Sequence, residues 1–449
     1  MSTTESVAQT GQQATTPSSP KKMRKVALAS FMGTVIEFYE FGIYGTAAAL
    51  VFAHVFFPAL GEGAGTIVSF VTLGVAFVAR PIGSIIFGHF GDRIGRKKTL
   101  LVTMLLMGIC TFIMGTLPTA AAIGVMAPII LIVLRVGQGI AAGGEWAGAA
   151  LFTSEHAPKE SRGFWASFTN FGGAVANILA LVTFLITTLS MTDAQFENWG
   201  WRIPFLASVI LLIFGLWVRL QMEDTPVFKA QTGEAEPVRF PFKDALASQW
   251  REIFLASGAL SFAFAFGYMG ITYLTNYGTA TLGLSYVTVL GAGILGNVIN
   301  GVSMLCAAAL SDRIGRRKVL LIAAVASIPW GLVLFPLLDL QTAGAFWLGV
   351  GLTFIIGGFG FGIAGSFLSE LFPTRYRYTA AGLGYNFSTI LGAALPPIIA
   401  SAVIPAFGSM VFGVILALYG VVSVICILTF KETRHVNLDE ESETMANRT

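Results

Sequence analysis

Twelve long apolar stretches divide this sequence, and they constrain its fold more than any other feature. Each is near the ~20 residues that a helix needs to cross a bilayer. They lie at approximately 26–53, 64–90, 98–117, 121–152, 163–189, 201–221, 252–282, 286–310, 318–338, 342–369, 377–404 and 407–430. Only 11% of the 449 residues are charged, against about a quarter in soluble domains. We therefore expect an all-α membrane protein with twelve transmembrane helices in the lipid bilayer of the cell (inner or plasma) membrane.

The basic residues predict which way the chain crosses the bilayer, because Lys and Arg are enriched in cytoplasmic loops. With an N-terminus inside the cell, the loops that face outward carry a single basic residue, Arg202. Both termini are therefore predicted to be cytoplasmic. The first twenty residues are rich in Ser, Thr and Gln and lack an apolar core, so residues 1–25 are predicted to form a disordered tail and no cleaved signal peptide.

The two halves of the chain repeat. GHFGDRIGRKKTL at 88–100 matches AALSDRIGRRKVL at 308–320, and SEHAPKESR at 154–162 matches SELFPTRYR at 369–377. Two motifs in the same order predict two six-helix bundles, at 26–221 and 252–430, as in many secondary transporters. A cytoplasmic linker at 222–251 and a tail at 431–449 complete the organisation. Within the linker, residues 240–250 form either a short amphipathic segment at the membrane surface or an ordinary connection.

Five charged residues fall at membrane depth, all in the first half: Glu37, Glu40, Arg80, Arg135 and Glu145. Each would cost about 2.5–3.5 kcal/mol if it faced lipid. We therefore expect them to face the interior and one another. Two structural ion pairs, Glu37 with Arg135 or Glu145 with Arg80, remain an alternative to a functional role.

Two arginines suit a substrate that carries a carboxylate, because a guanidinium binds a carboxylate as a bidentate fork. Three acids against two arginines leave one surplus carboxylate, and Glu37, Glu40 and Glu145 are the candidates for proton coupling. The second half offers uncharged hydrogen-bonding groups instead, although those on the seventh span are equally explained by packing. The candidate substrate-binding residues are Tyr44, Arg80, Arg135, Gln138, Tyr273, Asn276, Tyr277, Asn297, Asn300, Tyr385 and Asn386.

Several blocks resemble a known family. GxxxDRxGR after span two resembles the signature of the major facilitator superfamily, and a related DRxGR block follows span eight. GTVIEFYEFGIYG (33–45), RVGQGIAAGGEWAGAAL (135–151) and ELFPTRYRYTAAGLGYN (370–386) resemble its metabolite:proton symporter branch. The resemblance covers about residues 26–435. It implies inward transport of small carboxylates or zwitterions such as shikimate, 2-oxoglutarate, citrate, proline or betaine, with the proton as coupling ion and no other cofactor. Glu40 departs from the pattern, since the family has Asp there.

The resemblance also implies a cytoplasmic gate in which ion pairs and helix-end dipoles latch the inner loops. Anchoring of the topology by basic residues is the simpler alternative. The gate residues are Gly88, Asp92, Arg93, Gly95, Arg96, Glu155, Arg162, Asp312, Arg313, Arg316, Glu370 and Arg377.

The predicted function is proton-coupled uptake of a small organic acid or zwitterion by alternating access, by a protein acting as a monomer. A proton-coupled exporter is the alternative, although FGGAVANILAL (171–181) lacks the proline that exporters of the superfamily carry in span five. A non-transporting receptor is disfavoured by the twelve spans and the repeat. No nucleic-acid partner, metal site or catalytic residue set is expected, so the protein is predicted not to be an enzyme. The three cysteines are predicted to be packing residues.

Overall fold

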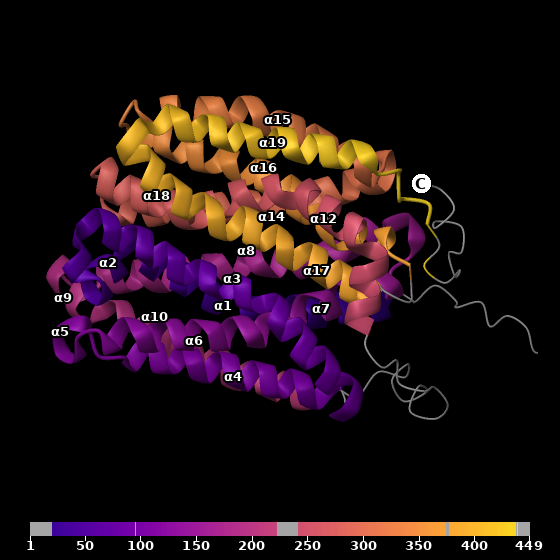
Figure 1. Cartoon of the computed structure of the whole chain (residues 1–449), viewed down its shortest axis with the longest axis horizontal. Coiled ribbons are helices and arrows are strands. Elements are labelled where there is room, and N and C mark those ends of the chain that lie inside the picture. The colour runs from indigo at the N-terminus through magenta and orange to yellow at the C-terminus, as the bar shows by residue number, and fades with distance from the viewer. Residues whose placement is uncertain (1–19, 95, 222–240, 374–376, 437, 439–449) are drawn as a thin grey trace, which may run out of the picture.

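The computed structural model describes residues 20–94, 96–221, 241–373, 377–436 and 438. These residues form helices and no strand, which confirms the predicted all-α class. Both bundles lie side by side, with the first drawn in indigo to magenta and the second in pink to yellow (Figure 1). The last described residues lie at one end of the helices, which we call the tail face; the other end is the far face.

The first bundle contains six long crossings and several short helices. Its elements are α1 (Pro20–Leu50), α2 (Phe52–Phe56), α3 (Gly61–Ile94), α4 (Arg96–Thr116), α5 (Ala120–Ile123), α6 (Met126–Ala142), α7 (Glu145–His156), α8 (Arg162–Leu189), α9 (Asp193–Asn198) and α10 (Ile203–Gln221).

The second bundle repeats this arrangement. Its elements are α12 (Pro241–Tyr268), α13 (Leu274–Asn276), α14 (Tyr286–Ile314), α15 (Arg316–Leu338), α16 (Ala343–Leu371), α17 (Arg377–Thr389), α18 (Leu395–Phe407) and α19 (Ser409–Thr429). Three π-helical segments, Met269–Tyr273, Tyr277–Thr281 and Ile390–Ala394, interrupt the seventh and eleventh crossings.

The helices agree closely with the predicted spans. Within the described part of the chain, eleven helices are long and apolar enough to cross a membrane, and the apolar helix Leu101–Thr116 fills the place of the third predicted span. The N-terminal tail predicted at residues 1–25 is shorter than expected, because residues 20–25 already belong to α1. Met23 explains why, since it is buried against Val26 and Ala157. Residues 1–19 lie outside the described part of the chain.

Two further elements differ from the sequence expectation. The fourth span is not one helix, because α6 ends at Ala142 and α7 begins at Glu145. The predicted linker is helical from Pro241, with a break in helical geometry at Gln249 before the membrane crossing. Residues 222–240 lie outside the described part.

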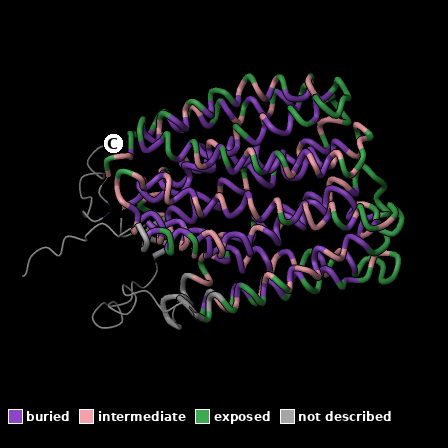
Figure 2. The backbone as a smooth tube through the Cα atoms, turned by 180° about the vertical axis from the view of Figure 1, so that it is seen from behind, coloured by how far each residue is buried: buried purple, intermediate pink, exposed green. Residues whose placement is uncertain are grey.

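The interior of the molecule runs along α1, α8, α14 and α16. Helix α1 packs on α8, α8 packs on α14 of the other bundle, and α14 packs on α16. Buried residues follow these central helices, whereas exposed residues gather on the outer helices and at both ends (Figure 2). Polar side chains on the central helices are therefore shielded from lipid.

Candidate functional site

The site begins with an unusually close contact between α3 and α6. A side chain at Gly139 would place its Cβ 2.2 Å from the carbonyl oxygen of Ala76, and one at Gly143 would lie 2.0 Å from that of Arg80. Such distances are impossible for real atoms, so glycine is required at both positions. The contact brings the charged residues of two helices into one layer of the bundle.

The buried ion pair of this layer joins Glu37 on α1 to Arg80 on α3. Arg80 Nη2 lies 3.4 Å from Glu37 Oε1, and the two side chains are 1% and 2% exposed. The expectation that the midspan charges face the interior is confirmed for Glu37, Glu40, Arg80, Arg135 and Glu145, which are all buried. This ion pair, between Glu37 and Arg80, is a different combination from the two predicted ones.

Aromatic rings surround the Arg80 guanidinium. Its central carbon lies 4.2 Å from the ring centre of Phe41 and 5.1 Å from that of Phe77. Rings at this distance attract a cation through their quadrupole and keep water away from it. Neither phenylalanine is among the predicted substrate-binding residues, although Phe41 lies one helical turn after Glu37.

Arg135 on α6 has a different environment. Its Nε donates to the Thr72 carbonyl at 3.4 Å, Nη2 donates to the Leu73 carbonyl at 3.2 Å, and Nη1 donates to Gln138 Oε1 at 2.6 Å. The Tyr44 ring covers it at 3.8 Å. All three guanidinium nitrogens are thus bonded to the protein itself.

The second acid of α1, Glu40, is bonded to a hydroxyl. Thr111 on α4 donates to Glu40 Oε2 at 2.5 Å, and Gln138 Nε2 donates to Thr111 Oγ1 at 2.6 Å. A chain of hydrogen bonds therefore runs from Arg135 through Gln138 and Thr111 to Glu40. Thr111 was missed in the sequence analysis, although a polar residue inside an apolar span is a signal that could have identified it.

Glu145 is buried at the first position of α7, directly after Gly143 and Gly144. The N-terminus of a helix favours a negative charge, because its backbone N–H groups and dipole point toward it. The break in the fourth span therefore places this acid at a helix end, where a continuous helix would have placed it in the middle.

The second bundle approaches this layer through α17. The Tyr385 ring stacks on Trp146 of α7 with centroids 3.5 Å apart. Asn386 Nδ2 donates to Ser84 Oγ at 3.0 Å and to the Gly143 carbonyl at 3.3 Å. Ser84 lies one turn after Arg80, so these two predicted residues of α17 are brought beside the charged layer.

Other predicted residues lie elsewhere. Asn276 donates to the Ala49 carbonyl at 2.8 Å, and Tyr277 donates to Asp339 Oδ1 at 3.2 Å. Ala49 is twelve residues beyond Glu37, about 18 Å along the helix, so Asn276 joins the bundles near the far face. Tyr273 packs there on Phe70 and Tyr277.

Asn297 and Asn300 are buried on α14. The Oδ1 atoms of both have no hydrogen-bond partner in the described structure. A buried acceptor without a donor is costly, and Asn297 Nδ2 donates within its own helix to the Gly293 carbonyl at 2.9 Å.

At the tail face, four side chains join the bundles. Glu370 on α16 accepts from Arg162 at 3.2 Å and from Arg316, whose Nε and Nη2 lie 3.2 and 3.1 Å from its two oxygens. Asp312 accepts from Arg316 at 2.6 Å and from the backbone N–H of Gly163 at 2.8 Å. Asp312 thereby lies at the N-terminus of α8, where the helix dipole favours an anion.

The remaining predicted gate residues are less well defined. Arg377 pairs with Glu155 at 3.5 Å, and Arg313 is exposed. Gly88, Asp92 and Arg93 lie in α3 and Arg96 begins α4, but their side chains lie outside the described part, as does Gly95.

The segment after α19 also belongs to this network, which the sequence analysis did not anticipate. Thr433 donates to Glu370 Oε2 at 2.9 Å, and the Val436 carbonyl accepts from Arg162 at 3.1 Å. Glu432 accepts from the backbone N–H groups of Arg316 at 2.7 Å and Arg317 at 3.2 Å, at the start of α15.

Most of this chain, which folds into two packed bundles with buried charges at mid-depth, matches a family model. The model, described as Major Facilitator Superfamily, covers residues 30–396. The chain belongs to the Major Facilitator Superfamily. It is therefore a multi-pass membrane protein of a transporter family and not an enzyme.

Individual relatives and a solved structure agree with this assignment. The chain is 40% identical to the inner membrane metabolite transport protein YhjE of Escherichia coli (strain K12), covering 92% of this chain and 95% of that protein. It is 39% identical to the shikimate transporter of the same organism, over 86% and 89% of the two chains. The fold matches the proton:xylose symporter XylE bound to 6-bromo-6-deoxy-D-glucose, with a TM-score of 0.73 at 18% identity over 93% and 98% of the chains.

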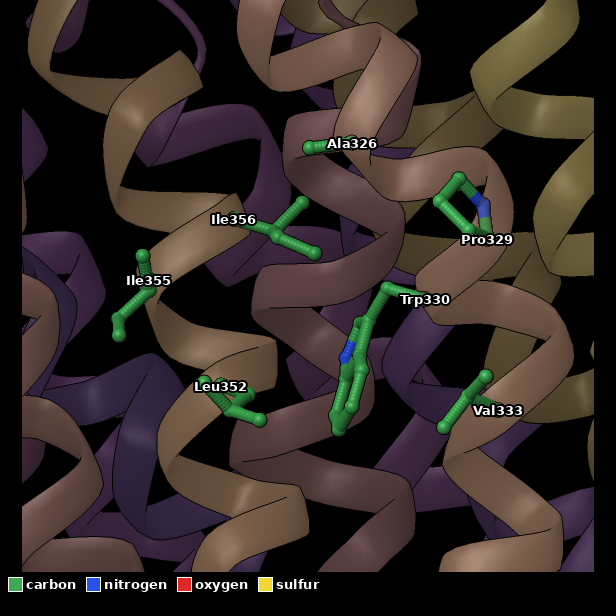
Figure 3. A pocket seen from close by; sticks show the side chains of 7 residues that line it. All are labelled: Ala326, Pro329, Trp330, Val333, Leu352, Ile355 and Ile356. Carbon is green, nitrogen blue, oxygen red and sulfur yellow. The ribbon is translucent and has the colours of Figure 1, made fainter.

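A hollow between α15 and α16 lies outside the charged layer of this transporter. Its volume is about 300 Å³, and Figure 3 shows its apolar lining, with the Trp330 ring at its centre. Trp330 Nε1 donates to Thr353 Oγ1 at 3.0 Å. Val333 in its wall is 51% exposed, so the hollow opens on the outer surface of the second bundle. With no charged side chain in its lining, it lacks the groups that would bind a carboxylate.

Proposed function

We propose that this protein takes up a small organic acid or zwitterion together with protons, by alternating access. The single observation that carries the proposal is the buried ion pair between Glu37 and Arg80. A buried charge pair is weak evidence for stability, because desolvation offsets much of the attraction. A pair at mid-depth with both partners in the interior is instead what a membrane protein uses for ion and substrate pathways.

The pair supplies a route to coupling. A substrate carboxylate that binds the Arg80 guanidinium competes with Glu37 for it. A carboxylate that loses its cationic neighbour takes up a proton more readily. Substrate and proton would therefore bind together. With Glu37 protonated and Arg80 paired with the substrate, less uncompensated charge would be buried when the bundles move. Glu40 and Glu145 are the alternative proton carriers.

We place the tail face in the cytoplasm. The basic residues of the loops gather there, which is the arrangement that membrane insertion favours. Glu370 and Asp312 close that face by joining the two bundles, and Asn276 joins them near the far face. These contacts would act as the gates of the transporter. The working unit would be the monomer, with residues 26–221 and 252–430 as its two halves.

The test is uptake into proteoliposomes that contain the purified protein, with shikimate, proline and betaine as probes. An inward proton gradient should drive accumulation of at least one of them, and a protonophore should abolish it. Accumulation of none of these acids, combined with proton-driven movement of bulky hydrophobic cations in the opposite direction, would instead support the alternative, a proton-coupled exporter.

A further inference from the structure

The two buried arginines differ in how much of their hydrogen-bonding capacity is used. Each of the three nitrogens of Arg135 donates to an acceptor of the protein. Arg80 donates from Nη2 to Glu37 at 3.4 Å, and its Nε, although buried, has no partner in the described structure. A charged donor that is buried without an acceptor is unfavourable, so this nitrogen marks an incomplete site.

The tail face shows what a complete site looks like. Arg316 presents its Nε and Nη2 to the two oxygens of Glu370, at 3.2 and 3.1 Å. This edge of a guanidinium matches a carboxylate bidentately. In Arg80, one nitrogen of the same edge is bonded: Nη2 donates to Glu37 at 3.4 Å, whereas Nε has no hydrogen-bond partner in the described structure. A second carboxylate would fit that edge by bonding to Nε and displacing Glu37 from Nη2.

A second unsatisfied group comes from the other bundle, on the helix α17 that meets the charged layer. Tyr385 is 1% exposed, and its hydroxyl has no hydrogen-bond partner in the described structure. The ring is held by stacking on Trp146 and by an edge contact with Phe264 at 5.0 Å. The next residue, Asn386, donates to Ser84, one turn after Arg80, so this part of α17 reaches the charged layer.

We propose, building on the proposed function, that Arg80 binds the substrate carboxylate through its Nε–Nη2 edge and that the Tyr385 hydroxyl binds a second polar group of the same molecule. Arg135 is then a positioning residue, which holds Gln138, Thr111 and Glu40 in place and does not touch substrate. The ligand class is a small carboxylate that carries a further hydrogen-bonding group. Such a molecule spans both bundles and links their movement.

The experiment compares an acid with its own methyl ester, because the ester keeps the rest of the molecule and removes the negative charge of the carboxylate. The probe is whichever of shikimate and proline stabilises the purified full-length protein more, because each carries a hydrogen-bonding group besides its carboxylate, and affinities are measured by thermal shift. Wild-type protein should prefer the acid by at least about tenfold, as a lost charge-assisted hydrogen bond predicts. Arg80→Gln should reduce this preference to near unity, whereas Arg135→Lys should keep it while lowering the melting temperature.

Tyr385→Phe provides a test that does not depend on the folding of the Arg80 variant. It removes a hydroxyl that has no partner and keeps the stacked ring, so the melting temperature should be unchanged or higher. Affinity for the acid should nevertheless fall by about fivefold to tenfold, the range of a neutral hydrogen bond.

The failures are distinguishable. If wild-type protein accumulates none of the acids under a proton gradient, the proposed function fails and this inference fails with it. If wild-type protein accumulates an acid while Arg80→Gln keeps the acid preference, or Tyr385→Phe binds the acid normally, the inference alone is wrong.

Discussion

Arg162 at the start of α8 donates to Glu370 at the end of α16, across 208 positions of sequence and from one bundle to the other. Both side chains are buried, and Glu370 also holds Arg316 and Thr433. One carboxylate therefore fixes three other groups at the tail face. Closure of this face depends on Glu370 more than on any exposed charge around it.

Replacing Glu370 with Gln should open the tail face. Breaking a buried ion pair from one side typically costs about 3–5 kcal/mol, because the remaining charge stays buried without a partner. The melting temperature should fall, and a cysteine introduced at Ser167 of α8, with the three native cysteines replaced, should become reactive to a polar thiol reagent. Glu155→Gln is the matched control, since Glu155 is 48% exposed and its buried partner Arg377 keeps its bonds to the carbonyls of Phe372 and Leu438. A pair with an exposed member should contribute only ~0–1 kcal/mol. Equal effects of the two changes would contradict this account of closure.

Replacing Glu37 with Gln should remove the dependence of uptake on proton concentration. In wild-type protein, uptake should fall as the external pH rises, because fewer protons are available to replace Arg80 as the partner of Glu37. Glutamine keeps the size and hydrogen-bonding capacity but carries no charge and no transferable proton. Initial uptake rates at several pH values would check this, and Glu40→Gln serves as the comparison. If the Glu37→Gln protein had the wild-type pH profile, an acid other than Glu37 would have to couple proton to substrate.

Replacing Thr111 with Val should destabilise the protein. The change removes the donor of Glu40 and the acceptor of Gln138, and a buried polar group left without its bond costs about 1–3 kcal/mol. Thr116→Val on the same helix is the control, because its exposed hydroxyl bonds to its own helix. That surface change should stay within about 0.5 kcal/mol. Denaturation in the same detergent would measure both, and indistinguishable values would argue against the hydrogen-bond chain.

Replacing Gly143 with Ala should force α6 away from α3. Its Cβ would lie 2.0 Å from the Arg80 carbonyl oxygen, whereas a Cβ at the neighbouring Gly144 would find its nearest atom at 3.8 Å. Overpacking of this kind costs typically about 1–3 kcal/mol, and here it would also shift Arg80. Gly143→Ala should therefore lose both thermal stability and uptake, while Gly144→Ala should keep both. Normal uptake by the Gly143 variant would show that the close contact is dispensable.

The spans, the two bundles and the burial of the midspan charges could be predicted because they follow from the composition and from the cost of a charge in lipid. The ion-pair partner of Glu37 could not be predicted. Helical spacing identifies the face on which a residue lies, but the partner depends on how α3 and α6 are rotated, and that rotation is set by contacts at Gly139 and Gly143. The π-helical segments could not be predicted either, because no local sequence signal marks them.

The segment that follows α19 has a practical consequence. Thr433 and Val436 bond to residues of both bundles, and Glu432 caps the start of α15. A truncation after Phe430, or a fusion partner joined there, would leave Arg162 and the first N–H groups of α15 without these acceptors. Residues 432–436 therefore help to hold the two bundles together at the tail face, and reporters or affinity tags should be attached beyond residue 438.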